Sequence, residues 1–156
     1  GIFSEAMYQK WGVPKATAQK WVGDEFHHPK AAVFGAFQDG ELIGVGCCVP
    51  FEFVRSNLSH SARVSLDKSL NKMFPGMSSS QIIHLGGLGV KKEIRGRLSP
   101  KLTKAMIAYA QEAGYDLCLG RTADKLIKFH NRLWHGKILT KVDGETWLYL
   151  KISPIK

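Results

Sequence analysis

The sequence predicts a mixed α/β fold in which helices flank a central, mostly antiparallel sheet. Two pairs of apolar runs, 32–37 with 42–49 and 138–142 with 146–152, each flank an Asp-Gly dipeptide, which is typical of a hairpin turn. Between the hairpins, residues 81–119 predict a strand, a helix and a second strand, joined as a parallel crossover. The expected order is helix, strand, strand, helix, strand, helix, strand, helix, strand, strand.

In the first half of the chain, one helix is expected before the first hairpin in the sequence and one after it. Residues 4–26 have apolar side chains at helical spacing, with a break at 12–14. Pro50 should end the second strand of the hairpin or form a bulge in it. One amphipathic helix is then predicted within 56–79 from four spaced apolar residues, Leu66, Leu70, Met73 and Phe74.

The second half begins with a glycine-rich strand, 81–90, and the helix that follows it. Glycines inside a strand are typical of close approach by a ligand or another backbone. Ser99 is a suitable N-cap, and Pro100 suits the first helical position. The apolar stripe of this helix runs to Gly114 through Leu102, Ala105, Met106, Tyr109, Ala110 and Ala113. Residues 116–119 predict a short strand, and 123–134 predict a last helix ended by Gly136.

Length and composition favour one globular domain, residues 1–156. Hydrophobic residues make up 44% and charged residues 22%, and the uncharged runs are too short to span a bilayer. The N-terminus lacks a basic head followed by an apolar run, so we expect a cytoplasmic protein without a signal peptide. The three cysteines, Cys47, Cys48 and Cys118, show no framework spacing, and CxxC and HExxH motifs are absent. We therefore expect buried thiols and no metal site.

The net charge of +9 favours an anionic partner, either a nucleic acid or a polyphosphate cofactor. The sequence contains no RNP, zinc-finger or KH motif, which argues against a nucleic-acid module. The 13 acidic residues form no cluster along the chain that would attract a cationic small molecule. The most prominent basic cluster comprises Lys91, Lys92, Arg95, Arg97, Lys101 and Lys104.

This basic cluster lies where the glycine-rich strand gives way to a helix. The free N–H groups and the dipole of a helix N-terminus attract anions, and Gly96 would let the backbone approach a phosphate. A pyrophosphate would fit there. The alternative is a solvated basic turn before an ordinary helix, and both interpretations stay open on physical grounds.

The segment 89–98, Gly-Val-Lys-Lys-Glu-Ile-Arg-Gly-Arg-Leu, resembles the acetyl-CoA motif of the GNAT superfamily. Residues 129–136, Phe-His-Asn-Arg-Leu-Trp-His-Gly, resemble the Phe-Tyr-x-x-x-Gly-Phe segment of the family's fourth helix. About residues 31–50 and 80–150 follow the element order of the family. The resemblance implies a GNAT-like fold and acetyl-CoA as cosubstrate, held by Leu88, Gly89, Val90, Arg95, Gly96, Arg97, Leu98, Ser99 and Lys101.

Two positions depart from the family's phosphate-binding loop. Leu98 replaces its first glycine and can still donate an N–H, whereas Pro100 replaces its second small residue and cannot. Three interpretations stay open: weaker cofactor binding, compensation by neighbouring basic residues, or a domain that no longer uses CoA.

The resemblance also implies catalytic groups for acetyl transfer to an amine. His84, six residues before Val90 on the same strand face, takes the place of the general base, and His130 takes the place of the tyrosine that protonates the thiolate. The alternative for both is a buried histidine with a structural role. Glu52 follows the third strand of the family's order, near the expected acceptor side. It is a candidate to bind a cationic substrate or to act as an alternative base.

We therefore expect an N-acetyltransferase that moves an acetyl group from acetyl-CoA directly to a primary amine. The acceptor stays open between a small molecule, a protein and an aminoacyl-tRNA, and a homodimer is compatible with the sequence. The alternative is a non-catalytic GNAT-like domain that binds a ligand or a nucleic acid.

Overall fold

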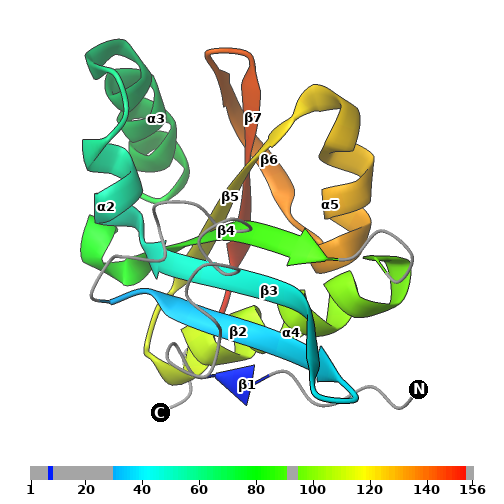
Figure 1. Cartoon of the computed structure of the whole chain (residues 1–156). Helices are drawn as coiled ribbons and strands as arrows, with labels where there is room; N and C mark the ends of the chain where they lie inside the picture. The colour runs from blue at the N-terminus through cyan, green and yellow to red at the C-terminus, as the bar shows by residue number, and fades with distance from the viewer. Residues whose placement is uncertain (1–6, 9–29, 91–94, 154–156) are drawn as a thin grey trace. The chain divides into compact units, whose positions relative to one another are not determined.

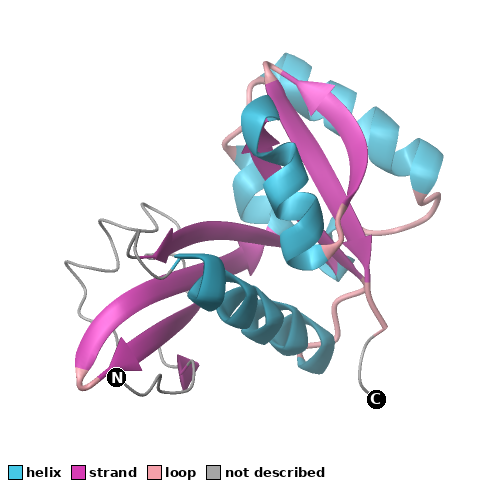
Figure 2. Cartoon of the chain, turned by 90° about the vertical axis from the view of Figure 1, so that its right-hand side faces the viewer, coloured by secondary structure: helices cyan, strands magenta, loops and turns pink. Residues whose placement is uncertain are grey.

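The computed structural model describes residues 7–8, 30–90 and 95–153 (Figure 1). The chain forms two compact units, 1–49 with 85–109 and 50–84 with 110–156. Strand β4 (Ile82–Val90) and helix α4 (Arg95–Glu112) each contribute residues to both units. Figure 2 distinguishes the helices from the strands.

In the first unit the strand order is β1-β2-β3-β4. Its first three strands, β1 (Met7–Tyr8), β2 (Ala32–Gln38) and β3 (Glu41–Pro50), pair antiparallel in sequence. The β2–β3 hairpin turns at Asp39 and Gly40, whose φ angles of 51° and 79° match the left-handed pair that a two-residue turn needs. This confirms the predicted hairpin.

Helix α4 packs on β3 within the first unit. A Cβ on Gly44 of β3 would lie 2.6 Å from Cδ2 of Leu98 and 3.1 Å from Cδ1 of Leu102. Tyr109, further along α4, makes an edge-to-face contact with Phe34 of β2 at 5.9 Å between ring centroids. Leu102 and Tyr109 of the predicted apolar stripe therefore face the sheet, whereas Ala113 at its end is exposed.

In the second unit the strand order is β4-β5-β7-β6. β4 pairs parallel with β5, and β6 pairs antiparallel with β7, as predicted from the crossover and the second hairpin. β7 also pairs antiparallel with β5. Figure 1 shows α3 and α5 on opposite sides of β5 and β7. The elements are α2 (Phe51–Ser56), α3 (His60–Met73), η2 (Ser79–Gln81), β5 (Leu117–Ala123), η4 (Asp124–Leu126), α5 (Ile127–Trp134), β6 (Lys137–Val142) and β7 (Glu145–Lys151).

Aromatic contacts join α2 and the end of α3 to one face of these strands. Phe51 of α2 contacts Trp147 of β7 edge to face, with ring centroids 6.3 Å apart. Phe74, which follows α3, contacts Tyr149 of β7 at 5.3 Å. Because Trp147 and Tyr149 are two residues apart, they lie on the same face of β7. Trp147 is almost fully buried, as expected for a core residue.

The predicted mixed α/β fold class is confirmed, but three details in the first half of the chain differ from the sequence analysis. Met7–Tyr8 forms a strand, which contradicts a helix at that point, and the rest of the predicted helix at 4–26 lies outside the described residues. α2 was not predicted: it begins directly after Pro50, which ends β3 as expected. In α3, Leu66 and Leu70 are buried as predicted, whereas Met73 is 47% exposed.

The start of α4 is a further correction. The sequence predicts Ser99 as N-cap and Pro100 as the first helical residue, but the helix begins at Arg95 and contains Pro100. Leu98 and Ser99 are 2% and 1% exposed, and Leu98 packs against Gly44. We attribute the extra turn to this burial, because it offsets the hydrogen bond that Pro100 cannot donate to the carbonyl of Gly96.

Gly136 was predicted to end the last helix. In the structure α5 ends at Trp134, His135 is its C-cap, and Gly136 follows the C-cap. His135 takes the left-handed conformation, with φ 57°, and its N–H donates to the carbonyl of Asn131 at 2.9 Å. Gly136 is required for a different reason, since a Cβ there would lie 2.8–3.0 Å from three ring carbons of the buried Trp134.

Replacing Gly136 with Ala should therefore lower the free energy of unfolding by about 1–3 kcal/mol, the usual cost of overpacking a rigid neighbour. Urea denaturation measures this cost. In a Trp134→Leu background the ring is gone, so the same substitution should cost much less. Equal costs in the two backgrounds would show that the contact with Trp134 does not exclude a side chain at Gly136.

Candidate functional site

The candidate anion site is the start of α4. β4 ends at Val90 and α4 begins at Arg95, and the first N–H groups of the helix have no partner within it. Arg97, Lys101 and Lys104 are exposed on the first turns of this helix. Their charges add to the positive end of the helix dipole. This part of the first unit can therefore bind an anion such as a diphosphate.

The predicted cofactor residues contribute to this site in different ways. Leu88, Gly89 and Val90 lie in β4 and Arg95 and Gly96 in the first turn of α4, but their side chains lie outside the described part of the structure. The side chains of Leu98 and Ser99 are buried, so they cannot face a ligand. The Ser99 hydroxyl has no hydrogen-bond partner among the described residues. Among the predicted cofactor residues, Arg97 and Lys101 are thus the ones with described, exposed side chains that can contact a phosphate.

His84 lies in β4 within the second unit and is 3% exposed. Its ring makes an edge-to-face contact with Trp147, with ring centroids 5.8 Å apart. It pairs with Leu119 across the parallel β4–β5 ladder. A histidine fixed between aromatic and apolar neighbours has few rotamers open to it, which suits either a positioned base or a structural core residue.

His130 lies in α5, where it is half-buried and contacts the ring of Phe129 at 5.3 Å. Burial lowers the pKa of His130 below its ordinary value. At neutral pH the imidazole is therefore mostly uncharged, and it can donate a hydrogen bond more readily than a whole proton.

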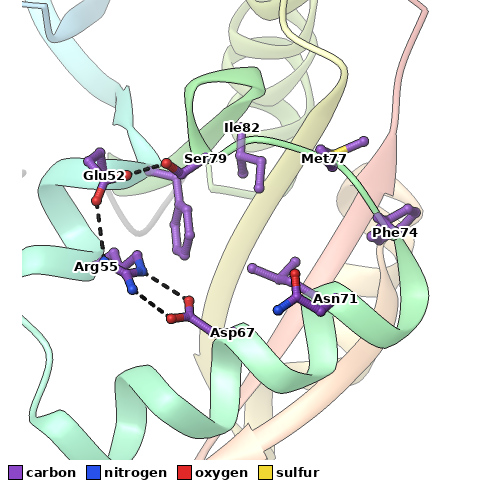
Figure 3. Close-up of a pocket in the computed structure, with 10 residues that line it drawn as sticks. Glu52, Arg55, Asp67, Asn71, Phe74, Met77, Ser79 and Ile82 are labelled. Carbon is purple, nitrogen blue, oxygen red and sulfur yellow. Dashed lines mark hydrogen bonds and ion pairs between the residues drawn. The ribbon is translucent and has the colours of Figure 1, made fainter.

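A cavity of about 350 Å³ lies in the second unit beside α2 and α3 (Figure 3). We call it the α2–α3 cavity. Its walls are Phe51, Glu52, Arg55, Asp67, Leu70, Asn71, Phe74, Met77, Ser79 and Ile82. Phe51, Leu70 and Ile82 are buried and form an apolar floor. The size and the mixture of apolar and polar walls are typical of a small-molecule site.

The polar wall of the α2–α3 cavity is a connected network. Arg55 donates from Nε to Oδ1 of Asp67 at 2.9 Å and from Nη2 to Oδ2 at 2.6 Å. The same guanidinium reaches Oε1 of Glu52 at 3.4 Å, and the hydroxyl of Ser79 donates to the other oxygen of Glu52. The Asp67 hydrogen bond raises the pKa of Arg55, which therefore stays charged.

The sequence singled out Glu52 but not the residues that surround it. Arg55, Asp67, Asn71 and Ser79 were missed, and the acidic residues were judged to form no cluster. In the fold, Glu52 and Asp67 converge on one guanidinium from two different helices. The only local indication in the sequence is the spacing of Glu52 and Arg55, three residues apart on one helical turn.

The predicted site residues are distributed over both units. Residues 88–101 of the cofactor set belong to the first unit, and Glu52, His84 and His130 belong to the second. Across 7–8, 30–90 and 95–153, no group of three or more His, Cys, Asp or Glu side chains could hold a metal ion. Among the described helices, none is long and apolar enough to cross a membrane.

Comparison with protein families decides where the chain belongs. The model of the acetyltransferase (GNAT) family matches residues 2–133. The chain belongs to the GNAT family. The family match includes the basic start of α4, His84 and His130, so it spans both units. No match is found among curated proteins.

Solved GNAT structures share the fold at low sequence identity. The chain is similar to an IAA acetyltransferase from Bacillus cereus, with 12% identity, a TM-score of 0.60 and coverage of 97% of this chain and 99% of that one. A Bacillus subtilis acetyltransferase in complex with CoA is 12% identical, with a TM-score of 0.64 and coverage of 95% of this chain and 98% of that one. The Campylobacter jejuni N-acetyltransferase PseH in complex with acetyl coenzyme A is 16% identical, with a TM-score of 0.57 and coverage of 97% of this chain and 100% of that one.

Proposed function

We propose that residues 1–156 form one acetyl-CoA-dependent N-acetyltransferase domain that transfers the acetyl group directly to a primary amine. The observation that supports this most strongly is the cationic start of α4, where exposed Arg97 and Lys101 accompany free helical N–H groups. Membership of the GNAT family and the CoA-bound structures of two similar proteins favour acetyl-CoA as the anion.

Direct transfer needs an amine nitrogen that is free of its extra proton. The nitrogen attacks the thioester carbonyl carbon, the C–N bond forms, the C–S bond breaks, and the CoA thiolate leaves. His84 is the proposed acceptor of the proton that the nitrogen loses. His130 is the proposed hydrogen-bond donor to the thiolate; because burial lowers its pKa, solvent would supply the final proton.

A thiol-release assay with 5,5′-dithiobis(2-nitrobenzoate) tests this function on a panel of amines. The protein should add little background, since Cys47, Cys48 and Cys118 are all buried, and burial raises the pKa of the Cys118 thiol to about 12. We expect CoA release that depends on both acetyl-CoA and an amine. Acetyl-CoA binding without release on any amine would contradict the catalytic proposal.

A second candidate is a GNAT domain that binds a ligand or a nucleic acid without catalysis. One observation favours it: His130 replaces the family's usual tyrosine. Tight RNA binding that weakens steeply with salt, without CoA binding, would favour the nucleic-acid form of this candidate.

A further inference from the structure

We propose that the α2–α3 cavity binds the amine acceptor, and that this acceptor is a small cation with an apolar or aromatic body. The inference rests on the proposed acetyl transfer, because it names the substrate of that reaction. It uses only residues of the second unit.

The charge of the cavity wall favours a cation. Arg55 is neutralised by Asp67 through two short, parallel hydrogen bonds, an arrangement typical of strong guanidinium–carboxylate pairing. Glu52 is left with a longer contact to Arg55, at 3.4 Å, and with its side chain 54% exposed. Two carboxylates therefore face one guanidinium, and the wall has a net negative charge in a chain whose net charge is +9.

Glu52 is also held in place. The Ser79 hydroxyl and Arg55 each donate to one of its oxygens, and every carboxylate oxygen can accept a second hydrogen bond. Figure 3 shows Glu52, Arg55, Asp67 and Ser79 joined in one network along the same side of the cavity. An ammonium group would therefore meet a carboxylate that is already positioned, with capacity left for it.

The rest of the cavity suits a compact apolar group. Phe51, Leu70 and Ile82 form the floor, and Phe74 and Met77 lie at the chain's turn out of α3. Methionine and phenylalanine adapt well to flat or irregular apolar ligands, and aromatic faces also attract ammonium groups. About 350 Å³ is near the lower end of small-molecule sites, which favours a small amine over a folded protein surface.

The floor of the cavity is linked to the proposed base through neighbouring side chains. Ile82 lies two residues before His84 in β4, so the two side chains share one face of the strand. Phe51 contacts Trp147, and Trp147 contacts His84. A ligand seated on Phe51 and Ile82 would thus be connected to the candidate base through Trp147 and through β4.

The first test measures amine binding without acetyl-CoA. Phenethylamine and hexylamine are titrated by NMR. Each is compared with the alcohol of the same carbon skeleton, 2-phenylethanol or hexanol. We expect phenethylamine and hexylamine to shift the amide signals of 51–55 and 77–82, and to bind at least about 10-fold more tightly than the alcohols, the gain expected for a charge-assisted contact. Equal binding of amine and alcohol would overturn the inference.

Substitutions at the carboxylate test its role. Glu52→Gln keeps the size and the acceptor for Ser79 but removes the charge, so it should weaken phenethylamine binding about 10-fold and leave 2-phenylethanol binding unchanged. Asn71→Asp adds a carboxylate to the same cavity and should tighten amine binding, an effect that misfolding would not produce. Glu145→Gln, on an exposed residue at the start of β7, is the matched control and should change nothing.

Steady-state kinetics separate the failure of this inference from failure of the proposed function. If amines are acetylated and Glu52→Gln raises KM with little change in kcat, both are supported. If amines are acetylated with unchanged KM in Glu52→Gln, the cavity is not the acceptor site, while the function stands. If phenethylamine binds in the cavity but no amine is acetylated, the function is overturned and only a cation site remains.

Discussion

Replacing His84 with Gln is expected to lower kcat at neutral pH by about 100-fold or more, the range over which a positioned general base contributes. Glutamine resembles the imidazole in size and can form hydrogen bonds, but it cannot take a proton from the attacking nitrogen. Because His84 belongs to β4 rather than to the start of α4, the affinity for acetyl-CoA should stay unchanged. Thiol-release kinetics and a binding assay measure the two quantities separately.

Two further variants distinguish a proton acceptor from a packing residue at this position. His84→Glu restores a base and should recover part of the lost turnover, whereas a purely structural role predicts no recovery. His60→Gln, on an exposed histidine of α3, should leave turnover unchanged. Loss of the contact with Trp147 is monitored by near-UV circular dichroism. Normal turnover in His84→Gln would remove His84 from the mechanism.

Reversing two charges at the start of α4 is expected to cause a large loss of affinity for acetyl-CoA. Arg97→Glu combined with Lys101→Glu should weaken acetyl-CoA binding by at least about 100-fold, since each lost contact between charged groups contributes about 1.5–3 kcal/mol. Both side chains are exposed, so the fold should be preserved. Fluorescence competition with a labelled CoA analogue measures the affinity, and thermal unfolding checks that the variant is folded.

The control for this pair is Lys128→Glu with Lys151→Glu, which changes the net charge equally on exposed residues of α5 and β7. If the control weakens CoA binding as much as the α4 variant does, the effect comes from the overall charge. If neither variant changes the affinity, the start of α4 is not the phosphate site.

The parts of the fold predicted correctly depend on local chemistry. The hairpin turns at Asp39-Gly40 and Asp143-Gly144 need positive φ at both residues, and Asp-Gly supplies it. The parallel pairing of β4 and β5 follows from a helix that connects two strands. Neither inference needs information from distant parts of the chain.

The features that were missed depend on tertiary contacts. The extra turn at the start of α4 follows from the packing of Leu98 against Gly44, residues far apart in the sequence. The α2–α3 cavity forms only when α2 and α3 bring Glu52 and Asp67 to the same guanidinium. The sequence offered Glu52 as a lone candidate, because 14 residues lie between the two acidic residues.

Equilibrium dialysis of the protein against radiolabelled acetyl-CoA shows whether the start of α4 holds the cofactor. We expect saturable, stoichiometric binding that excess unlabelled CoA displaces and that the Arg97→Glu, Lys101→Glu variant loses. Failure of the folded wild-type chain to retain the label at saturating acetyl-CoA would contradict the assignment of the α4 start as a cofactor site, and with it the proposed acetyl transfer.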